Sequence, residues 1–269
     1  MLTNHIKCGG GLWALLAALL MVAPAPQASA QAKRIDPRAA QAPAEFWEAL
    51  QRDDADRVQT FLLRGAETNA VHPEHGPAVV VAARERAWKS LKLLATLAGT
   101  KVDAPNPLGE TAMMLAALHG HLDSVKLLHG RGAEVNRSGW TPLHYAATNG
   151  HVAVVRYLLD EHAYIDAQSP NRTTPLMMAA RHKRPDVVRL LIEAGADPGV
   201  RNDTGLDAAG YLQRQGETEL AAWVRERAAD YARRYGTLER PRTVEAIEAE
   251  KRDAAGQGAA PARLPGMRN

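Results

Sequence analysis

Histidines near the middle of the chain are the side chains best suited to do chemistry. The stretch GWTPLHYAATNGHVAVVRYLL, Gly139 to Leu159, holds His144 and His151, and His121 precedes it. Imidazoles can bind a transition metal or move protons, but such a site needs convergent ligands and further groups that orient them. These histidines therefore form either a reactive cluster or a set of structural contacts.

The same polar residues recur along the chain at a regular spacing. TPLHYAATNGHVAVVRYLL from Thr141 aligns with TAMMLAALHGHLDSVKLLHG from Thr111 and with TPLMMAARHKRPDVVRLLIEAG from Thr174. Weaker copies lie on either side, and the six copies start at residues 44, 77, 111, 141, 174 and 204. The histidines follow the repeat, which favours a structural role repeated in each unit over a single chemical site.

Each copy has the pattern of a helical hairpin. Thr141 can cap a helix with its hydroxyl, and Pro142 suits the first helical position, where no amide donor is needed. Gly150 can end this helix in a left-handed conformation that a Cβ would disfavour. The apolar residues between Val152 and Leu159 then return at helical spacing, which predicts a second helix.

A repeat of about 33 residues with the motif T-P-L-H-x-A resembles the ankyrin repeat, over about residues 41–235. The resemblance implies an all-α solenoid, over residues 43–235, of about five to six helix-turn-helix units with short β-turn tips. It also implies that His144 bonds the threonine of its own unit and of the next. His121 and His151 are expected at the starts of second helices.

The repeat departs from the family pattern in places. The copies that start at Trp140–Thr141 and at Thr204 follow their predecessors after only 30 residues, which predicts short hairpin tips there. His162 and Lys183 stand where glycine is usual. A non-glycine residue in the left-handed conformation costs about 1 kcal/mol, so either the local geometry differs or a contact compensates.

Both ends of the repeat have the polar character of terminal units. A long helix is predicted over residues 217–235, with Leu220, Trp223 and Val224 facing inward and the arginines 225, 227, 233 and 234 facing outward. Residues 236–269 are expected to be a partly disordered tail with a short helix around 244–252, and residues 31–42 a flexible leader.

The first 30 residues have the pattern of a secretory signal peptide. Lys7 precedes an apolar run from Leu12 to Ala23, and Ala28-Ser29-Ala30 is a small-residue cleavage site. The alternative is an uncleaved anchor, although the run is short for a bilayer of about 30 Å. The pattern predicts a periplasmic or secreted protein of bacterial type. Because Cys8 is the only cysteine, the mature chain would have no disulfide and no thiolate metal site.

Charge and motifs exclude several classes of function. The formal net charge is +3 with no concentrated basic stripe, so we expect no nucleic-acid partner. The acidic residues Glu134, Asp166 and Asp197 recur at turns, and catalytic serine, zinc-helix and phosphate-loop motifs are missing from the sequence. We expect no enzyme activity, no metal, no cofactor, no membrane contact after signal cleavage, and a monomer. The alternative is a hydrolase or metal-dependent enzyme that uses the histidines.

The resemblance implies a protein-binding role for the concave face, formed by turn tips and first helices. Trp140 is the strongest candidate, because tryptophan is enriched at binding hot spots, although packing in its shortened hairpin is the alternative. The run RHKR, Arg181 to Arg184, would suit an acidic partner. The register assigns these contact positions: Glu110, His119, Trp140, Asn149, Thr173, Arg181, His182 and Tyr211.

The sequence leaves the biological role of such binding open. A scaffold or accessory protein, an inhibitor such as an immunity protein, and an effector aimed at a host would all present the same kind of surface. The identity of the partner is equally open.

Overall fold

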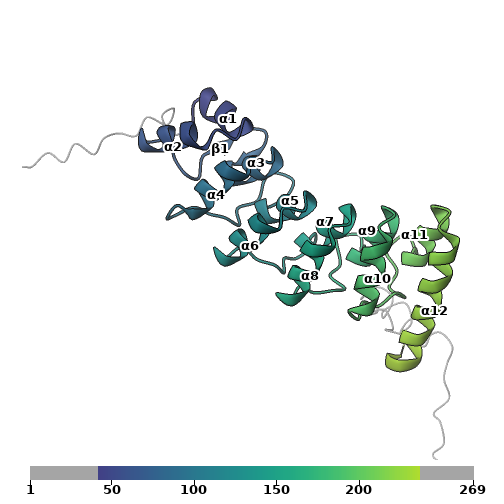
Figure 1. The fold of residues 1–269 in the computed structure, drawn as a ribbon. Coiled ribbons are helices and arrows are strands. Elements are labelled where there is room, and N and C mark those ends of the chain that lie inside the picture. The colour runs from purple at the N-terminus through teal and green to yellow at the C-terminus, as the bar shows by residue number, and fades with distance from the viewer. Residues whose placement is uncertain (1–41, 237–269) are drawn as a thin grey trace, which may run out of the picture. The chain divides into compact units, whose positions relative to one another are not determined.

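The computed structural model describes residues 42–236, which form a row of helical hairpins (Figure 1). The expected signal peptide (1–30), most of the leader (31–42) and the tail with its short helix (244–252) lie outside the described residues. Within residues 42–236, no helix combines the length and the hydropathy needed to cross a lipid bilayer.

Between residues 42 and 236 the helices follow one another in six pairs, each a first helix and a second helix. A two-stranded antiparallel ribbon, β1 (Val71–His72) with β2 (Gly76–Pro77), forms one of the turn tips. The pairs are α1 (Ala44–Gln51) and α2 (Ala55–Leu63), α3 (Ala78–Arg84) and α4 (Trp88–Thr96), α5 (Ala112–Leu118) and α6 (Leu122–Gly130), α7 (Pro142–Asn149) and α8 (Val152–Asp160), α9 (Pro175–Arg181) and α10 (Pro185–Glu193), and α11 (Ala208–Arg214) and α12 (Thr218–Tyr235).

Neighbouring units pack through their first helices. α5 lies between α3 and α7, and α9 lies between α7 and α11, while each first helix also packs on its own second helix. The alanine pairs predicted to allow close approach, such as Ala116-Ala117 and Ala146-Ala147, are fully buried. The predicted all-α solenoid of helix-turn-helix units with short tips is therefore confirmed.

The starts of α5, α7, α9 and α11 are fixed by capping side chains, whereas proline precedes α1 and α3. Thr111 and Thr174 accept hydrogen bonds from the amides of Met114 and Met177, as the repeat predicts. In the last unit, however, the cap is Asp207, which accepts from the Gly210 amide at 2.7 Å. The predicted start at Thr204 is wrong by three residues, and the short tip expected there is not formed.

Left-handed residues mark the same three places in most units: the tip, the junction between the helices, and the end of the second helix. Most are glycines, but Lys183 (φ 54°) and His162 (φ 61°) also adopt this conformation. Contacts accompany both departures from glycine. The His162 carbonyl accepts from Asn136 Nδ2 at 2.9 Å, and Lys183 Nζ lies 3.6 Å from Glu217 Oε1. The glycine positions predicted from the repeat are therefore confirmed as left-handed positions.

Candidate protein-binding surface

His144 is a buried structural bridge between two units. Its Nδ1 atom lies 2.9 Å from Thr141 Oγ1 and accepts from the Thr141 amide, so it completes the cap of α7. Its Nε2 atom lies 2.9 Å from the Thr173 carbonyl in the next unit, which is the residue before the expected threonine. Burial lowers the pKa of His144 to about 4, so the ring is neutral and donates through Nε2.

The other repeated histidines also begin helices. His121 Nδ1 accepts from the Ser124 amide at the start of α6, and its ring stacks on Trp88 with centroids 4.2 Å apart. His151 precedes α8, and its Nε2 lies 2.9 Å from the Leu118 carbonyl. Each imidazole has its own local partners, so the rings do not converge. Within residues 42–236, no group of three His, Cys, Asp or Glu residues is placed to hold a metal ion.

At the turns after the second helices, Asn and Asp side chains accept hydrogen bonds from the backbone of the next unit, and we call this series the turn ladder. Asn69 accepts from the Lys101 amide at 2.8 Å, and Asn136 accepts from the Tyr164 amide at 2.7 Å. Asp166 has the same place one unit later and accepts from the Asp197 amide at 3.1 Å. The predicted turn role of Asp166 is thus confirmed, and this ladder joins successive units at the ends of their second helices.

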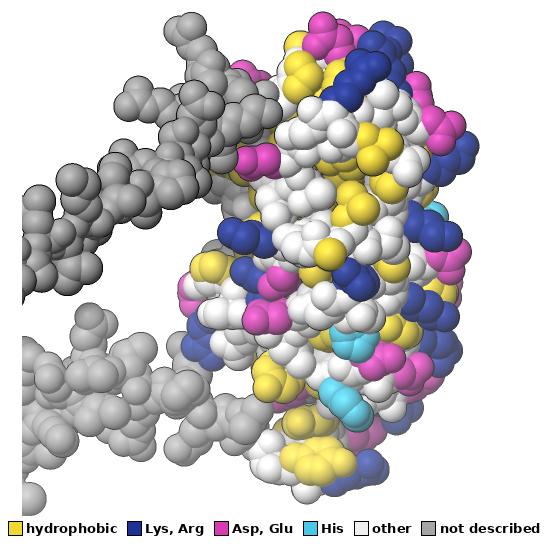
Figure 2. Space-filling model, turned by 90° about the vertical axis from the view of Figure 1, so that its left-hand side faces the viewer, with side chains coloured by type: hydrophobic (Ala, Val, Ile, Leu, Met, Phe, Trp, Pro, Cys, Tyr) yellow, Lys and Arg dark blue, Asp and Glu magenta, His cyan; other side chains and the backbone are white. Residues whose placement is uncertain are grey.

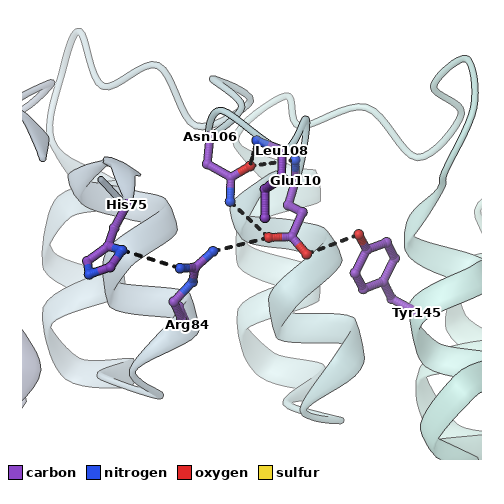
Figure 3. Close-up of polar contacts among 6 residues, drawn as sticks. All are labelled: His75, Arg84, Asn106, Leu108, Glu110 and Tyr145. Atoms are coloured by element: carbon purple, nitrogen blue, oxygen red, sulfur yellow. Dashed lines mark hydrogen bonds and ion pairs between the residues drawn. The ribbon is translucent and has the colours of Figure 1, made fainter. Parts of the chain in front are cut away.

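Glu110 is the centre of a polar network across three units (Figure 3). Arg84 from α3 donates to Glu110 Oε2 at 3.2 Å, and Asn106 Nδ2 donates to the same oxygen at 2.8 Å. The Tyr145 hydroxyl from α7 donates to Oε1 at 3.2 Å. His75 lies beyond Arg84, with 3.4 Å between Nδ1 and Nη1. Since the Glu110 side chain is only 19% exposed, this carboxylate mainly joins units.

Several predicted contact residues form a row at the ends of the first helices. His119, Asn149 and His182 follow α5, end α7 and follow α9, respectively. Asn149 Nδ2 donates to the Leu118 carbonyl at 2.7 Å, and Arg86 Nε donates to His119 Nδ1 at 3.2 Å. Burial, followed by the neighbouring arginines, lowers the pKa of His119 and of His182. Cationic side chains therefore supply the charge of this row while its histidines stay neutral.

Trp140 is partly accessible at a tip, and Arg181 is accessible at the end of a first helix. Trp140 is half-buried at a tip, and its ring packs edge-on against His144 with centroids 5.2 Å apart. Arg181 is exposed at the end of α9, beside the exposed His182. We use "first-helix surface" below for the tips and first-helix ends that carry Glu110, His119, Trp140, Asn149, Arg181 and His182.

Charges of both signs lie on the face of the molecule shown in Figure 2. Lys and Arg side chains are interspersed there with Asp, Glu and hydrophobic side chains. Such a mixed surface can form local pairs of complementary charges with a partner.

The family model for ankyrin repeats (3 copies) matches residues 46–138 and 130–202. The chain belongs to the ankyrin-repeat family. Ankyrin repeats generally mediate protein–protein interaction and are typically non-enzymatic modules.

Curated proteins with this repeat give the same result from sequence similarity. The chain is 33% identical to the tyrosine-protein kinase Shark of Drosophila melanogaster over 126 residues, which is 45% of this chain and 13% of that protein. It is 35% identical to the mouse nuclear factor NF-kappa-B p105 subunit over 136 residues (48% and 14%). It is 30% identical to the mouse B-cell lymphoma 3 protein homolog over 154 residues (55% and 34%). The chain thus spans about a third or less of these relatives.

Two predicted contact residues need correction in the ankyrin-repeat register. Thr173 is 2% exposed, its carbonyl accepts from His144, and its amide donates to Ser169 Oγ, so its side chain is not available to a partner. Tyr211 is the fourth residue of α11, the place of Tyr145 in α7, and its hydroxyl accepts from Asn202 Nδ2 at 2.8 Å. The residues of the last unit that match Arg181 and His182 are Arg214 and Gln215, both exposed.

A glycine in the sequence could have located the helix cap of the last unit, which the prediction missed. Gly216 matches Gly150 and Lys183 as a left-handed junction, and counting back from it places the cap of the last ankyrin repeat at Asp207. The Glu110 network has no comparable signal. Its members come from three repeats, and only the stacking brings them together.

Proposed function

We propose that this ankyrin-repeat protein is an exported interaction module that binds a partner protein through its first-helix surface and catalyses no reaction. The proposal is supported by a difference between the repeated side chains and those that occur in one unit only. Repeated side chains such as His144 and Asp166 are used within the scaffold, whereas unit-specific side chains such as Trp140, Arg181 and His182 remain accessible.

An acidic patch on the partner fits this surface best. Arg181 is exposed at the end of α9, and Lys183 and Arg184 follow it. Arg184 Nε donates to the Thr148 carbonyl at 3.1 Å, which fixes its side chain beside Asn149. Tryptophan and arginine are both enriched at binding hot spots, and complementary charge mainly sets specificity and association rate.

Export rests on the N-terminal sequence pattern. The proposal places the mature chain in the periplasm or outside the cell, with a role as scaffold, accessory subunit or inhibitor of its partner. Mass spectrometry of the exported protein should find a new N-terminus at Gln31. A protein that retains residues 1–30 at the membrane would contradict export of the soluble chain.

Affinity capture tests the binding surface. The tagged mature chain is compared with a Trp140→Ala, Arg181→Ala, His182→Ala variant, and with a control that carries Lys126→Ala and Arg156→Ala on the exposed sides of α6 and α8. The proposal predicts that the first variant loses the partner and the control keeps it. Equal recovery by both variants would assign binding to another surface. An activity assay of the recovered partner then separates a scaffold from an inhibitor.

A further inference from the structure

The tip formed by β1 and β2 carries a pair of half-buried histidines. His72 ends β1, and His75 directly precedes β2. The Nδ1 atom of His72 accepts hydrogen bonds from the amides of Glu74 and His75, at 3.2 and 3.3 Å. These two bonds close the turn between the strands. Because an imidazole nitrogen accepts only when it carries no proton, the closed turn requires a neutral His72 with its proton on Nε2.

His75 is in the same protonation state because of an arginine. Its Nδ1 atom lies 3.4 Å from Nη1 of Arg84, which comes from α3 (Figure 3). Since a guanidinium group can only donate hydrogen bonds, this contact also requires an unprotonated nitrogen. The rings of His72 and His75 stack, with 4.5 Å between their centroids and 10° between their planes. The closed tip is therefore built from two neutral, stacked imidazoles.

Protonation of this pair would oppose every contact that closes the tip. Each Nδ1 atom would change from an acceptor into a donor, and it would then face the amide or guanidinium donors that it now accepts from. The two positive charges would lie in stacked rings beside the permanent charge of Arg84. Histidine is the side chain whose charge ordinarily changes between about pH 5 and 8, so mild acid produces this conflict.

The groups around the pair offer little negative charge to offset such a change. Glu74 lies in the turn itself, where its side chain is exposed and screened by solvent. Glu110 lies beyond Arg84, and its Oε2 atom is already paired with that guanidinium at 3.2 Å. From α1, Trp47 packs edge-on against His72 with 5.1 Å between the centroids. The other described residues that line the hollow beside these two rings are uncharged: Ala42, Ala44, Val71 and Pro73.

The β1–β2 tip is packed closely against the next tip. A Cβ on Gly76 would lie 2.8 Å from the Cα and Cβ atoms of Asn106, so the two tips meet without a gap. Asn106 in turn orients Glu110, because its Nδ2 donates to Oε2 at 2.8 Å and its Oδ1 accepts from the Glu110 amide at 2.9 Å. A change in the β1–β2 tip therefore reaches Glu110 both through Asn106 and through Arg84.

We propose that His72 and His75 form a pH switch at the β1–β2 tip. At neutral pH the two unprotonated rings close the turn and position Arg84 beside Glu110. In mild acid both rings gain a proton, the turn opens, and the Glu110 end of the first-helix surface loosens. The switch is a property of the chain alone, so it does not depend on the proposed binding of a partner.

Amide hydrogen exchange followed by NMR on the full chain tests the switch. Between about pH 7.5 and about pH 5, the protection factors of the Glu74 and His75 amides should fall roughly tenfold, because their common acceptor is lost. The Tyr164 amide is the internal control. It donates to the side chain of Asn136 at 2.7 Å, and that acceptor does not titrate, so its protection factor should stay the same.

A variant with His72→Asn and His75→Asn separates the charge from the fold. An asparagine oxygen can accept the same turn amides but takes up no proton, so the amides of residues 74 and 75 should keep their protection at both pH values. Circular dichroism checks that the variant remains folded. Unchanged protection in the natural chain, or the same acid-dependent fall in the variant, would overturn the proposal. Imidazole nitrogen shifts that place the proton of neutral His72 on Nδ1 would also overturn it, whatever the variant does.

Discussion

The Tyr145 hydroxyl donates a hydrogen bond to the Glu110 carboxylate across a repeat boundary, with 3.2 Å between Oη and Oε1. Arg84 reaches the same carboxylate from the repeat on the other side, also at 3.2 Å. One acidic side chain thus links three consecutive units. Its removal affects two interfaces, so its energetic effect exceeds that of an ordinary surface acid, which contributes little to stability.

We expect Glu110→Ala to lower the free energy of unfolding by about 2 kcal/mol and Tyr145→Phe to lower it by about 1 kcal/mol. In a double-mutant cycle monitored by urea denaturation, the Tyr145→Phe effect should largely disappear in the Glu110→Ala background. Tyr211→Phe is the matched control, because that tyrosine has the same place in the last unit and bonds Asn202 instead. Additive effects of Tyr145 and Glu110 would contradict the shared network.

His144 should give stability that depends on pH. Burial lowers its pKa to about 4 from an ordinary value of 6.5, so the folded state favours the neutral ring. This contribution is present above pH 6.5 and is lost as pH falls through 4, and it amounts to about 3 kcal/mol. His144→Asn should be less stable than the natural protein at pH 7 and lose less stability between pH 6.5 and 4. Urea midpoints across that range test this, and parallel curves would contradict it.

The contribution of Asp166 to stability should depend on pH in the opposite direction to that of His144. Burial, with the nearby Asp197 carboxylate, raises its pKa to about 6, so the folded state favours the protonated acid. Its favourable contribution is complete below pH 3.8 and is lost as pH rises through 6. At pH 7, Asp166→Asn should raise the free energy of unfolding by about 2 kcal/mol, because the charge is removed and the amide can donate as Asn136 does.

The reverse substitution controls for this effect. Asn136→Asp at the matching place should destabilise the protein at pH 7, since an ionised carboxylate cannot donate to the His162 carbonyl. Thermal unfolding at pH 7 and pH 4 compares the two variants. If Asp166→Asn gives the same change in stability at both pH values, the carboxylate charge is not the cause.

Gly120 and Gly216 have the same left-handed place in two units, with φ of 71° and 79°, but different surroundings. A Cβ on Gly120 would lie 2.4 Å from His151 Nδ1, whereas a Cβ on Gly216 would meet nothing within 4 Å. Gly216→Ala should therefore cost about 1 kcal/mol from backbone strain, and Gly120→Ala at least about 2 kcal/mol, because the His151 ring must also move. Chemical denaturation measures both, and equal costs would contradict the close packing of His151.

The fold was predictable from the sequence because similar helix-start and helix-end residues recur in most units. Thr141, Pro142 and Gly150 specify where a helix begins and ends, and their recurrence fixes the units. The prediction was wrong at Thr204, where a threonine in a loop imitates the capping threonine, while Asp207 forms the cap. Since threonine and aspartate are both preferred N-cap residues, the residue type alone could not decide the register.

The candidate surface was harder to predict than the fold. Thr173 and Trp140 both precede a capping threonine, yet Thr173 is buried beneath a hydrogen bond from His144 while Trp140 is half-buried at its tip. Whether a position is accessible depends on the side chain that stacks on it from the next unit. A pattern read within one repeat does not contain that information.

Stacking between consecutive units has a mechanical consequence. Each joint between first helices, such as α5 on α7 and α7 on α9, adds its own small rotation to the path of the chain. The curvature and twist of the repeat are therefore the sum of the rotations between its units. We therefore expect a substitution at one joint, such as Gly120→Ala, to change the direction of the units beyond it more than the fold of any one hairpin.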